Sequence, residues 1–85
     1  MPYSNNCERE AKVIRTWIDN GWVCLRLQDD REIRFLAAKN RRLRSGSPSQ
    51  LANIEIICNG SGLHWPDLDE DLSVQGIVAG RLGAE

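Results

Sequence analysis

One segment of this chain gathers the residue types that could bind a cation or move a proton. It follows the single histidine, His64, and its carboxylates fall within five positions: Asp67, Asp69, Glu70 and Asp71. Carboxylate oxygens are the usual ligands of Ca²⁺ and Mg²⁺, but the segment lacks the sixth-position glycine and the distant glutamate of an EF-hand loop. Solvation, pairing with arginines or a position near a helix N-terminus explains such carboxylates equally well. We therefore assign no metal ligand here.

His64 could form an acid/base couple with Asp67 or Asp69. A nucleophile would then be needed, and Cys58 and Ser61 are the nearest by sequence. One histidine without a recognisable triad is weak evidence for catalysis. We interpret His64 as a structural residue and assign no catalytic residue. A small enzyme or metal protein centred on His64 remains an alternative hypothesis.

Arginines form the second chemically distinctive set, because the guanidinium fork binds carboxylate or phosphate in two-point fashion. Three of them fall in strand-like stretches, namely Arg15, Arg26 and Arg34. Three more fall in a basic connection over residues 37–46, namely Arg41, Arg42 and Arg44. With His64, this second group is a candidate ligand or anion site.

Alternating apolar residues and turn signals predict the strands that position the first group. Asn20-Gly21 is the strongest short hairpin signal, and a second turn is expected at residues 29–31. These turns set an inward-facing register of apolar partners: Ile18 with Val23, Thr16 with Leu25, Ile14 with Leu27, Leu27 with Ile33, and Leu25 with Phe35. A slip of one residue in either hairpin would scatter these partners over both faces.

The same register predicts that Arg15, Arg26 and Arg34 line up across the three strands on the outer face, beside Trp17 and Cys24. Like charges on neighbouring strands are unfavourable. Either the arginines splay into water and cover Trp17 with their stems, or something negative compensates them. The compensation could be phosphate, or the carboxylates of residues 67–71 from the same chain or a symmetry mate. A net charge of -1 favours the carboxylates.

The remaining chain predicts one α+β domain over residues 11–85, behind a flexible arm over residues 1–10. Ser47, Pro48 and Gln50 match a helix start with a capping box. Alternation along the second half places His64 opposite Leu63 and Trp65. The expected order is β-β-β-α-β-β-α: an antiparallel three-stranded meander, a short helix, two further strands and a C-terminal helix. The first three strands are expected at 12–18, 22–28 and 32–36, and the first helix from 48. Two further strands are expected at 53–58 and 63–65, and the last helix at 74–79 between Ser73 and Gly80.

Composition excludes several classes of protein. A sequence pI of about 5.8 is far below that of a dedicated nucleic-acid domain. The cysteines are odd in number and form no CxxC pair, which argues against a disulfide framework and a zinc site; they are Cys7, Cys24 and Cys58. No apolar run suits a signal peptide or a membrane span. We expect a cytoplasmic protein with no cofactor and no membrane partner.

The run from His64 to Val74, followed by Gly76 and Gly80, resembles the hallmark of the bacterial domain of unknown function 2442 family. The resemblance extends back through the early strands, the basic connection ending at Leu43 and the Ser49-Gln50 helix. It implies a small α+β protein without an agreed biochemical activity. It also implies that relatives are often encoded beside a second small protein in toxin–antitoxin-like pairs.

Two positions depart from the family pattern. Asp30 stands in the second turn where glycine is usual, and Arg41-Arg42 stand where Phe-Pro is expected. Some relatives carry an added helix-turn-helix domain. These 85 residues leave no room for one, so DNA binding does not carry over.

The leading hypothesis is therefore a non-enzymatic protein-interaction module. A chain this short has a thin core, which an oligomer interface would supplement. We expect self-association, with a dimer favoured, and an antitoxin-like contact with a second small protein. The expected interaction surface is Arg15, Trp17, Trp22, Arg26, Arg34, Asp67, Asp69, Glu70 and Asp71. A less favoured alternative is a nucleic-acid-binding accessory protein that uses the arginine patch.

Overall fold

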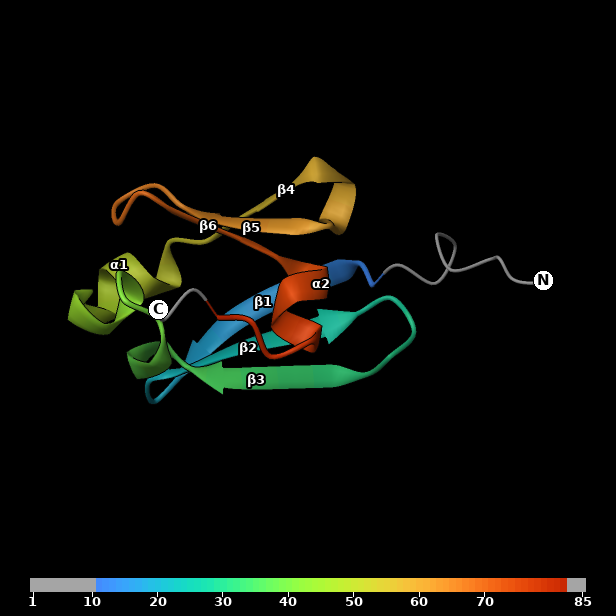
Figure 1. The fold of residues 1–85 in the computed structure, drawn as a ribbon, viewed down its shortest axis with the longest axis horizontal. Helices are drawn as coiled ribbons and strands as arrows, with labels where there is room; N and C mark the ends of the chain where they lie inside the picture. The colour runs from blue at the N-terminus through green and yellow to red at the C-terminus, as the bar shows by residue number, and fades with distance from the viewer. Residues whose placement is uncertain (1–10, 83–85) are drawn as a thin grey trace.

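Two antiparallel three-stranded sheets pack on opposite sides of one hydrophobic core in the computed structural model, which describes residues 11–82 (Figure 1). The first sheet is ordered β1 (Val13–Asp19), β2 (Trp22–Leu27), β3 (Glu32–Leu36). The second sheet is ordered β4 (Glu55–Ile57), β5 (Gly62–Trp65), β6 (Glu70–Ser73). The α+β class is confirmed, whereas the expected arm over residues 1–10 lies outside the described residues.

Short helical segments connect the strands. The helices are α1 (Pro48–Ala52) and α2 (Val74–Val78), and single 3₁₀ turns cover Ala37–Lys39, Leu43–Ser45 and Cys58–Gly60. The capping box before α1 is confirmed, because the Ser47 hydroxyl accepts from the backbone N–H of Gln50 and the Gln50 side chain accepts from that of Ser47. Ser73 caps α2 in a similar way by accepting from Gly76. Local sequence signals therefore place both helix starts correctly.

The first hairpin has the predicted turn. Asn20 and Gly21 have φ angles of 52° and 89°, as the tight turns that suit twisted antiparallel strands require. The pairs Ile18–Val23 and Thr16–Leu25 form as expected. The expected pair Ile14–Leu27 is wrong, because the register shifts at Ile14 and Val13 faces Leu27 instead. Such a bulge turns one extra residue out of the ladder, so Ile14 is 58% exposed.

The second hairpin turns one residue earlier than expected. Its loop is closed by the Leu27 N–H, which donates to the Arg31 carbonyl at 2.8 Å. Asp30 sits in this loop at a φ of 72°. The observed pairs are Leu25–Ile33 and Val23–Phe35, so the expected pairs Leu27–Ile33 and Leu25–Phe35 are wrong. The partners move by two residues, which leaves every side chain on its expected face of the sheet.

Side chains from both sheets, both helices and the connection between β3 and α1 form one core. It contains Val13, Val23, Leu25, Leu27, Phe35, Ala37, Leu43, Leu51, Leu63, Trp65, Val74 and Ile77. Trp65 is fully buried, and its indole N–H donates to the Leu51 carbonyl at 3.1 Å. His64 points away from this core, on the opposite side of β5 from Leu63 and Trp65, as expected. The outer faces of the two sheets consequently point in opposite directions.

Two expectations about the second sheet are wrong. Strand β6 was expected as a loop, because its acidic residues carry no strand-like apolar pattern, and pairing with β5 orders it. The strand expected over residues 53–58 is limited to β4, because Cys58 takes a φ of 54° and begins a 3₁₀ turn. Ile56 is 41% exposed on this short edge strand.

Candidate functional site

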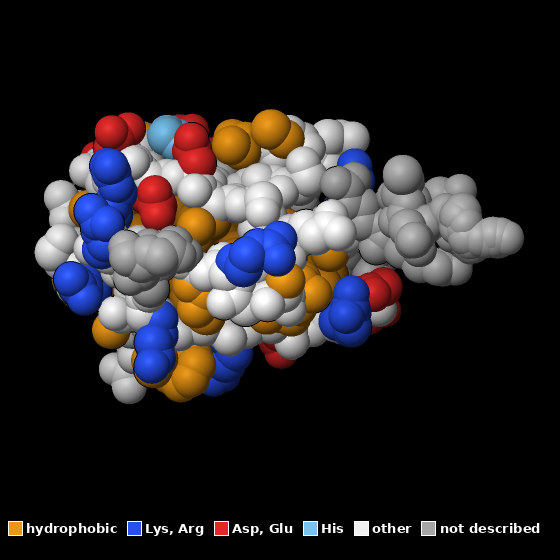
Figure 2. Space-filling view, viewed as in Figure 1, with side chains coloured by type: hydrophobic (Ala, Val, Ile, Leu, Met, Phe, Trp, Pro, Cys, Tyr) orange, Lys and Arg blue, Asp and Glu red, His pale blue; other side chains and the backbone are white. Residues whose placement is uncertain are grey.

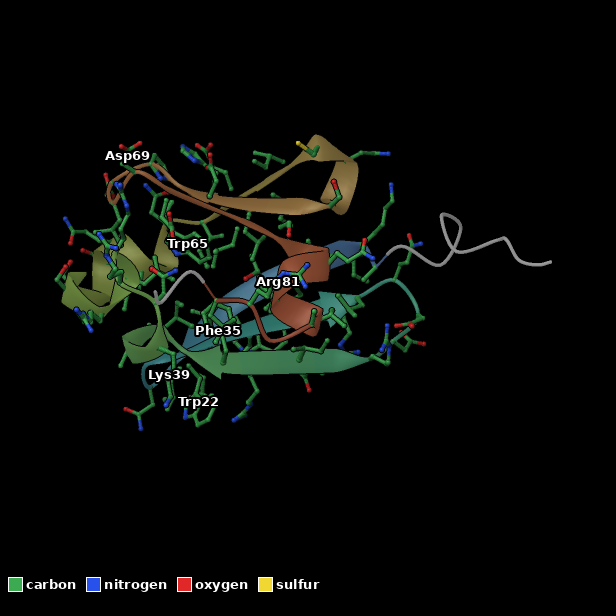
Figure 3. All side chains as sticks on the ribbon, viewed as in Figure 1. Trp22, Phe35, Lys39, Trp65, Asp69 and Arg81 are labelled. Atoms are coloured by element: carbon green, nitrogen blue, oxygen red, sulfur yellow. The ribbon has the colours of Figure 1, made fainter. Side chains whose placement is uncertain are left out.

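The outer face of the first sheet brings the predicted arginines and tryptophans together. We call this surface the tryptophan–arginine face and define it by Arg15, Trp17, Asp19, Trp22, Arg26, Glu32 and Arg34. Residues on it alternate with core residues along each strand. Figure 3 places Trp22 on this side of the molecule, away from the second sheet. The face therefore contains five of the nine residues expected at an interaction surface, plus two carboxylates.

The arginines do not form the straight row that the expected register gave. Arg15 faces Arg26 across β1 and β2, but Arg26 faces Glu32 on β3. Arg34 lies two residue pairs further along β2 and β3, opposite Cys24. The earlier second turn causes this offset, and it replaces a like-charge neighbour with an opposite-charge one. All three arginines still share one face.

Two of the arginines lie over tryptophan rings. The guanidinium carbon Cζ of Arg15 is 4.8 Å from the Trp17 ring centroid, and that of Arg34 is 5.5 Å from the Trp22 centroid. An exposed contact of this kind contributes about 0.5–1 kcal/mol. Both tryptophans remain partly exposed. The face therefore displays flat apolar rings beside cationic groups.

Carboxylates of the same sheet neutralise part of this charge. Arg26 Nη2 is 3.7 Å from Glu32 Oε2, and Arg34 Nη2 is 3.8 Å from Asp19 Oδ2. These are long contacts between partly exposed side chains, so they hold the groups only loosely. Sequence reasoning missed Glu32 and Asp19 as counter-charges. The correct register would have revealed Glu32, because it places that residue directly opposite Arg26.

Cys24 lies beneath this face, between Trp17 and Arg34 in the cross-strand order. Its side chain points outward with its neighbours on the face, yet only 1% of the residue is exposed. Burial raises the pKa of the Cys24 thiol, and the Arg34 charge opposes that effect. The aromatic and arginine side chains therefore cover Cys24 at the centre of the sheet.

The acidic residues 67–71 lie on the other side of the molecule. Figure 3 shows Asp69 above the second sheet and Trp22 below the first, and Figure 2 shows acidic side chains and the histidine along the same upper edge. Asp69 and Glu70 approach Arg42 at 3.6 and 3.9 Å, and Asp67 accepts from Asn53 at 3.1 Å. The expected pairing between these carboxylates and the arginine row of the same chain is therefore wrong. The intervening core separates them.

The basic connection supplies the counter-charge for these carboxylates. Arg42 also donates to the Asp69 backbone carbonyl at 3.1 Å. Sequence reasoning missed Asn40, a fully buried residue whose side-chain amide donates to Glu70. Arg41 and Arg44 are exposed. Arg42 thus pairs with the acidic segment. The candidate anion site of Arg41, Arg42, Arg44 and His64 stays a prediction.

His64 lies in a cross-strand row between Glu55 on β4 and Asp71 on β6. Its Nδ1 is paired with the Asp71 carboxylate, so the enzyme alternative, which pairs His64 with Asp67 or Asp69, names the wrong partner. The hydrogen bond with Asp71 raises the pKa of His64. Ser61, one of the two residues nearest in sequence that could serve that alternative as a nucleophile, donates its hydroxyl to the Cys58 carbonyl at 2.8 Å. Within residues 11–82, no cluster of three or more histidine, cysteine or acidic side chains could hold a metal ion.

Comparison with known proteins matches residues 13–83 to the family described as protein of unknown function, DUF2442. A crystal structure of a protein of unknown function from Rhodospirillum rubrum is similar, with a TM-score of 0.81 and 33% identity over 87% of this chain and 92% of that chain. An NMR structure of an uncharacterised protein from Chromobacterium violaceum has a TM-score of 0.78 and 28% identity, covering 89% and 72%. No curated protein matches. No helix within the described residues is long and apolar enough to cross a membrane.

Proposed function

We propose that this chain, which belongs to the DUF2442 family of proteins of unknown function, is a non-enzymatic protein-interaction module that self-associates through the tryptophan–arginine face. The observation that carries this proposal is the pair of arginine–tryptophan contacts, Arg15 over Trp17 and Arg34 over Trp22, on a solvent-facing sheet. Tryptophan and arginine are the residues most enriched among the energetic anchors of protein interfaces.

The size of the face sets the expected strength. Three strands about 4.8 Å apart and about six residues long cover roughly 300 Å². A standard stable interface buries about 800 Å² on each partner. We therefore expect the association to be weak and concentration-dependent, with a dissociation constant in the upper micromolar range or above.

Sedimentation equilibrium from low micromolar to millimolar concentration tests self-association. The weight-average mass of the natural protein should rise with concentration. A Trp17→Ala, Trp22→Ala double variant should remain monomeric over the same range. An Arg44→Ala variant is the matched control, because Arg44 is an exposed arginine on the basic connection, outside the face. A natural protein that stays monomeric throughout would overturn the proposal.

The family resemblance also favours this chain as the antitoxin-like partner of a second small protein. We propose that the second protein binds the same face, since the tryptophans there offer apolar area that does not depend on the identity of the bound protein. Co-expression with any small protein encoded next to the gene, followed by co-purification, tests this contact. Loss of the complex in the Trp17→Ala, Trp22→Ala variant is the expected result, and an unchanged complex would contradict this choice of surface.

A further inference from the structure

We propose that the tryptophan–arginine face binds the same face of a second copy, with the two copies related by a two-fold axis. This inference rests on the proposed self-association and names its partner and symmetry. Two stacked sheets, each contributing its outer face, would lie about 10 Å apart. The tryptophans would fill the centre of that layer, and the charged side chains would pair across it.

The two charged surfaces lie far apart on the molecule. The acidic residues 67–71 and the tryptophan–arginine face are on opposite sides of the core (Figure 3). If one copy's arginines bound another copy's acidic segment, each contact would be head-to-tail. Such contacts close only into rings and otherwise continue as open chains. A closed dimer needs a surface that is complementary to itself.

The tryptophan–arginine face is complementary to itself in charge. It interleaves three arginines with two carboxylates: Glu32 faces Arg26 across β2 and β3, and Asp19 approaches Arg34. The existing ion pairs are long, at 3.7 and 3.8 Å. The side chains of Arg34 and Asp19 are 51% and 59% exposed. Arg26 and Arg34 can therefore each exchange the carboxylate they now pair with for one on a second copy at little cost.

The carboxylates of Asp19 and Glu32 also argue against nucleic acid as the ligand of the tryptophan–arginine face. Sheets that bind single-stranded nucleic acid combine stacking aromatic rings with a positively charged surface. Here Glu32 and Asp19 stand among the arginines, and each would lie close to a bound phosphate backbone. A protein face with mixed charge meets no such repulsion.

Charge reversal on the full chain tests the inference. In the cationic variant, Asp19→Arg with Glu32→Arg, the face carries positive charge alone. In the anionic variant, Arg26→Glu with Arg34→Glu, the face is predominantly negative. Each variant alone should self-associate at least roughly tenfold more weakly than the natural protein, because like charges meet across the two-fold axis. An equimolar mixture should associate at least as well as the natural protein, which also shows that both variants are folded.

The cationic variant alone separates the competing arrangements. If the partner surface were instead the acidic segment, this variant would self-associate more tightly than the natural protein, and the inference would be overturned. Stronger binding of labelled oligo(U) than of a second copy at low salt would likewise overturn it in favour of nucleic acid. A Glu55→Arg variant changes net charge on the opposite sheet and should leave self-association unchanged. A natural protein that never associates contradicts the proposed function itself, so the two failures are distinguishable.

Discussion

The side-chain amide of Asn40 donates a hydrogen bond to the Glu70 carboxylate, with 2.8 Å between Nδ2 and Oε2. The same nitrogen donates to the Leu82 carbonyl at 2.6 Å. The Asn40 side-chain oxygen accepts from the backbone N–H groups of Arg42 and Leu43 at 2.8 and 2.9 Å. Asn40 has no exposed surface. This one side chain therefore joins the basic connection, strand β6 and the chain after α2.

Replacing Asn40 with alanine should destabilise the fold by about 2–4 kcal/mol, because buried backbone donors and a carbonyl would lose their partner. Urea titration followed by tryptophan fluorescence measures the change. Asn53→Ala is the matched control, since Asn53 is exposed and its side-chain amide donates to the Asp67 carboxylate. We expect that control to cost less than about 0.5 kcal/mol. Equal losses in the two variants would contradict the role given to Asn40.

The pKa of His64 should lie above its ordinary value of 6.5, because the hydrogen bond with Asp71 stabilises the protonated ring. His64 is the one histidine of the chain, so its ring protons give an unambiguous NMR titration. Asp71→Asn removes the charged partner and should lower this pKa. Glu55→Gln is a milder change, because Glu55 acts on His64 only through its charge. An unchanged pKa in Asp71→Asn would show that the pair does not form.

The same pair makes stability depend on pH in a definite direction. A histidine whose pKa is raised by folding contributes stability that is fully present below its unfolded pKa of about 6.5. That contribution disappears as the pH rises through the folded pKa. The natural protein should therefore exceed His64→Gln in stability at acidic pH, and the difference should shrink as the pH rises above neutrality. A difference that grows with pH would contradict this assignment.

Local signals in the sequence predict the parts of this fold that local chemistry decides. The Asn20-Gly21 turn requires positive φ at both residues, and the capping box before α1 needs only residues three apart. Both appear as predicted. The bulge at Ile14 and the strand β6 depend on partners elsewhere in the chain. No window of sequence around them contains that information.

The candidate site divides in the same way. Alternation alone places Arg15, Arg26 and Arg34 on one face, because a shift of two residues conserves the side on which a residue points. The neighbours of each arginine depend on the second turn, where Asp30 adopts a conformation that favours glycine. The contacts of the acidic segment with Arg42 span 27 residues of sequence between Asp69 and Arg42. Only the packing of the two sheets brings these groups together.

The thiols of Cys24 and Cys58 should differ strongly in reactivity. Cys58 is exposed, whereas Cys24 is covered by the tryptophan–arginine face and has a raised pKa because of burial. Alkylation requires an accessible thiolate, so iodoacetamide should modify Cys58 first and Cys24 only slowly. Peptide mass mapping of time points measures both rates. Trp17→Ala should accelerate Cys24 modification, because Trp17 is its cross-strand neighbour, whereas Arg44→Ala should not. Equal rates at both cysteines in the natural protein would contradict the burial of Cys24.

The two aspartates of the second turn should respond in opposite ways to replacement by glycine. Asp30 has a φ of 72°, which costs a residue with a Cβ atom more than it costs glycine, so Asp30→Gly should stabilise the fold by about 0.5–1 kcal/mol. Asp29 accepts from the backbone N–H of Arg31 at 3.1 Å and from its Nε at 2.8 Å, so Asp29→Gly should destabilise it.

These contacts with Arg31 lower the pKa of Asp29 below its ordinary value. The stability that the Asp29 carboxylate contributes is therefore present at neutral pH and is lost as the pH falls through its folded pKa. Urea titrations of both glycine variants at neutral pH and near pH 2 measure the two effects. The deficit of Asp29→Gly should shrink in acid, whereas the gain in Asp30→Gly should persist because it comes from backbone conformation. A change in the same direction for both variants at neutral pH would contradict this description of the turn.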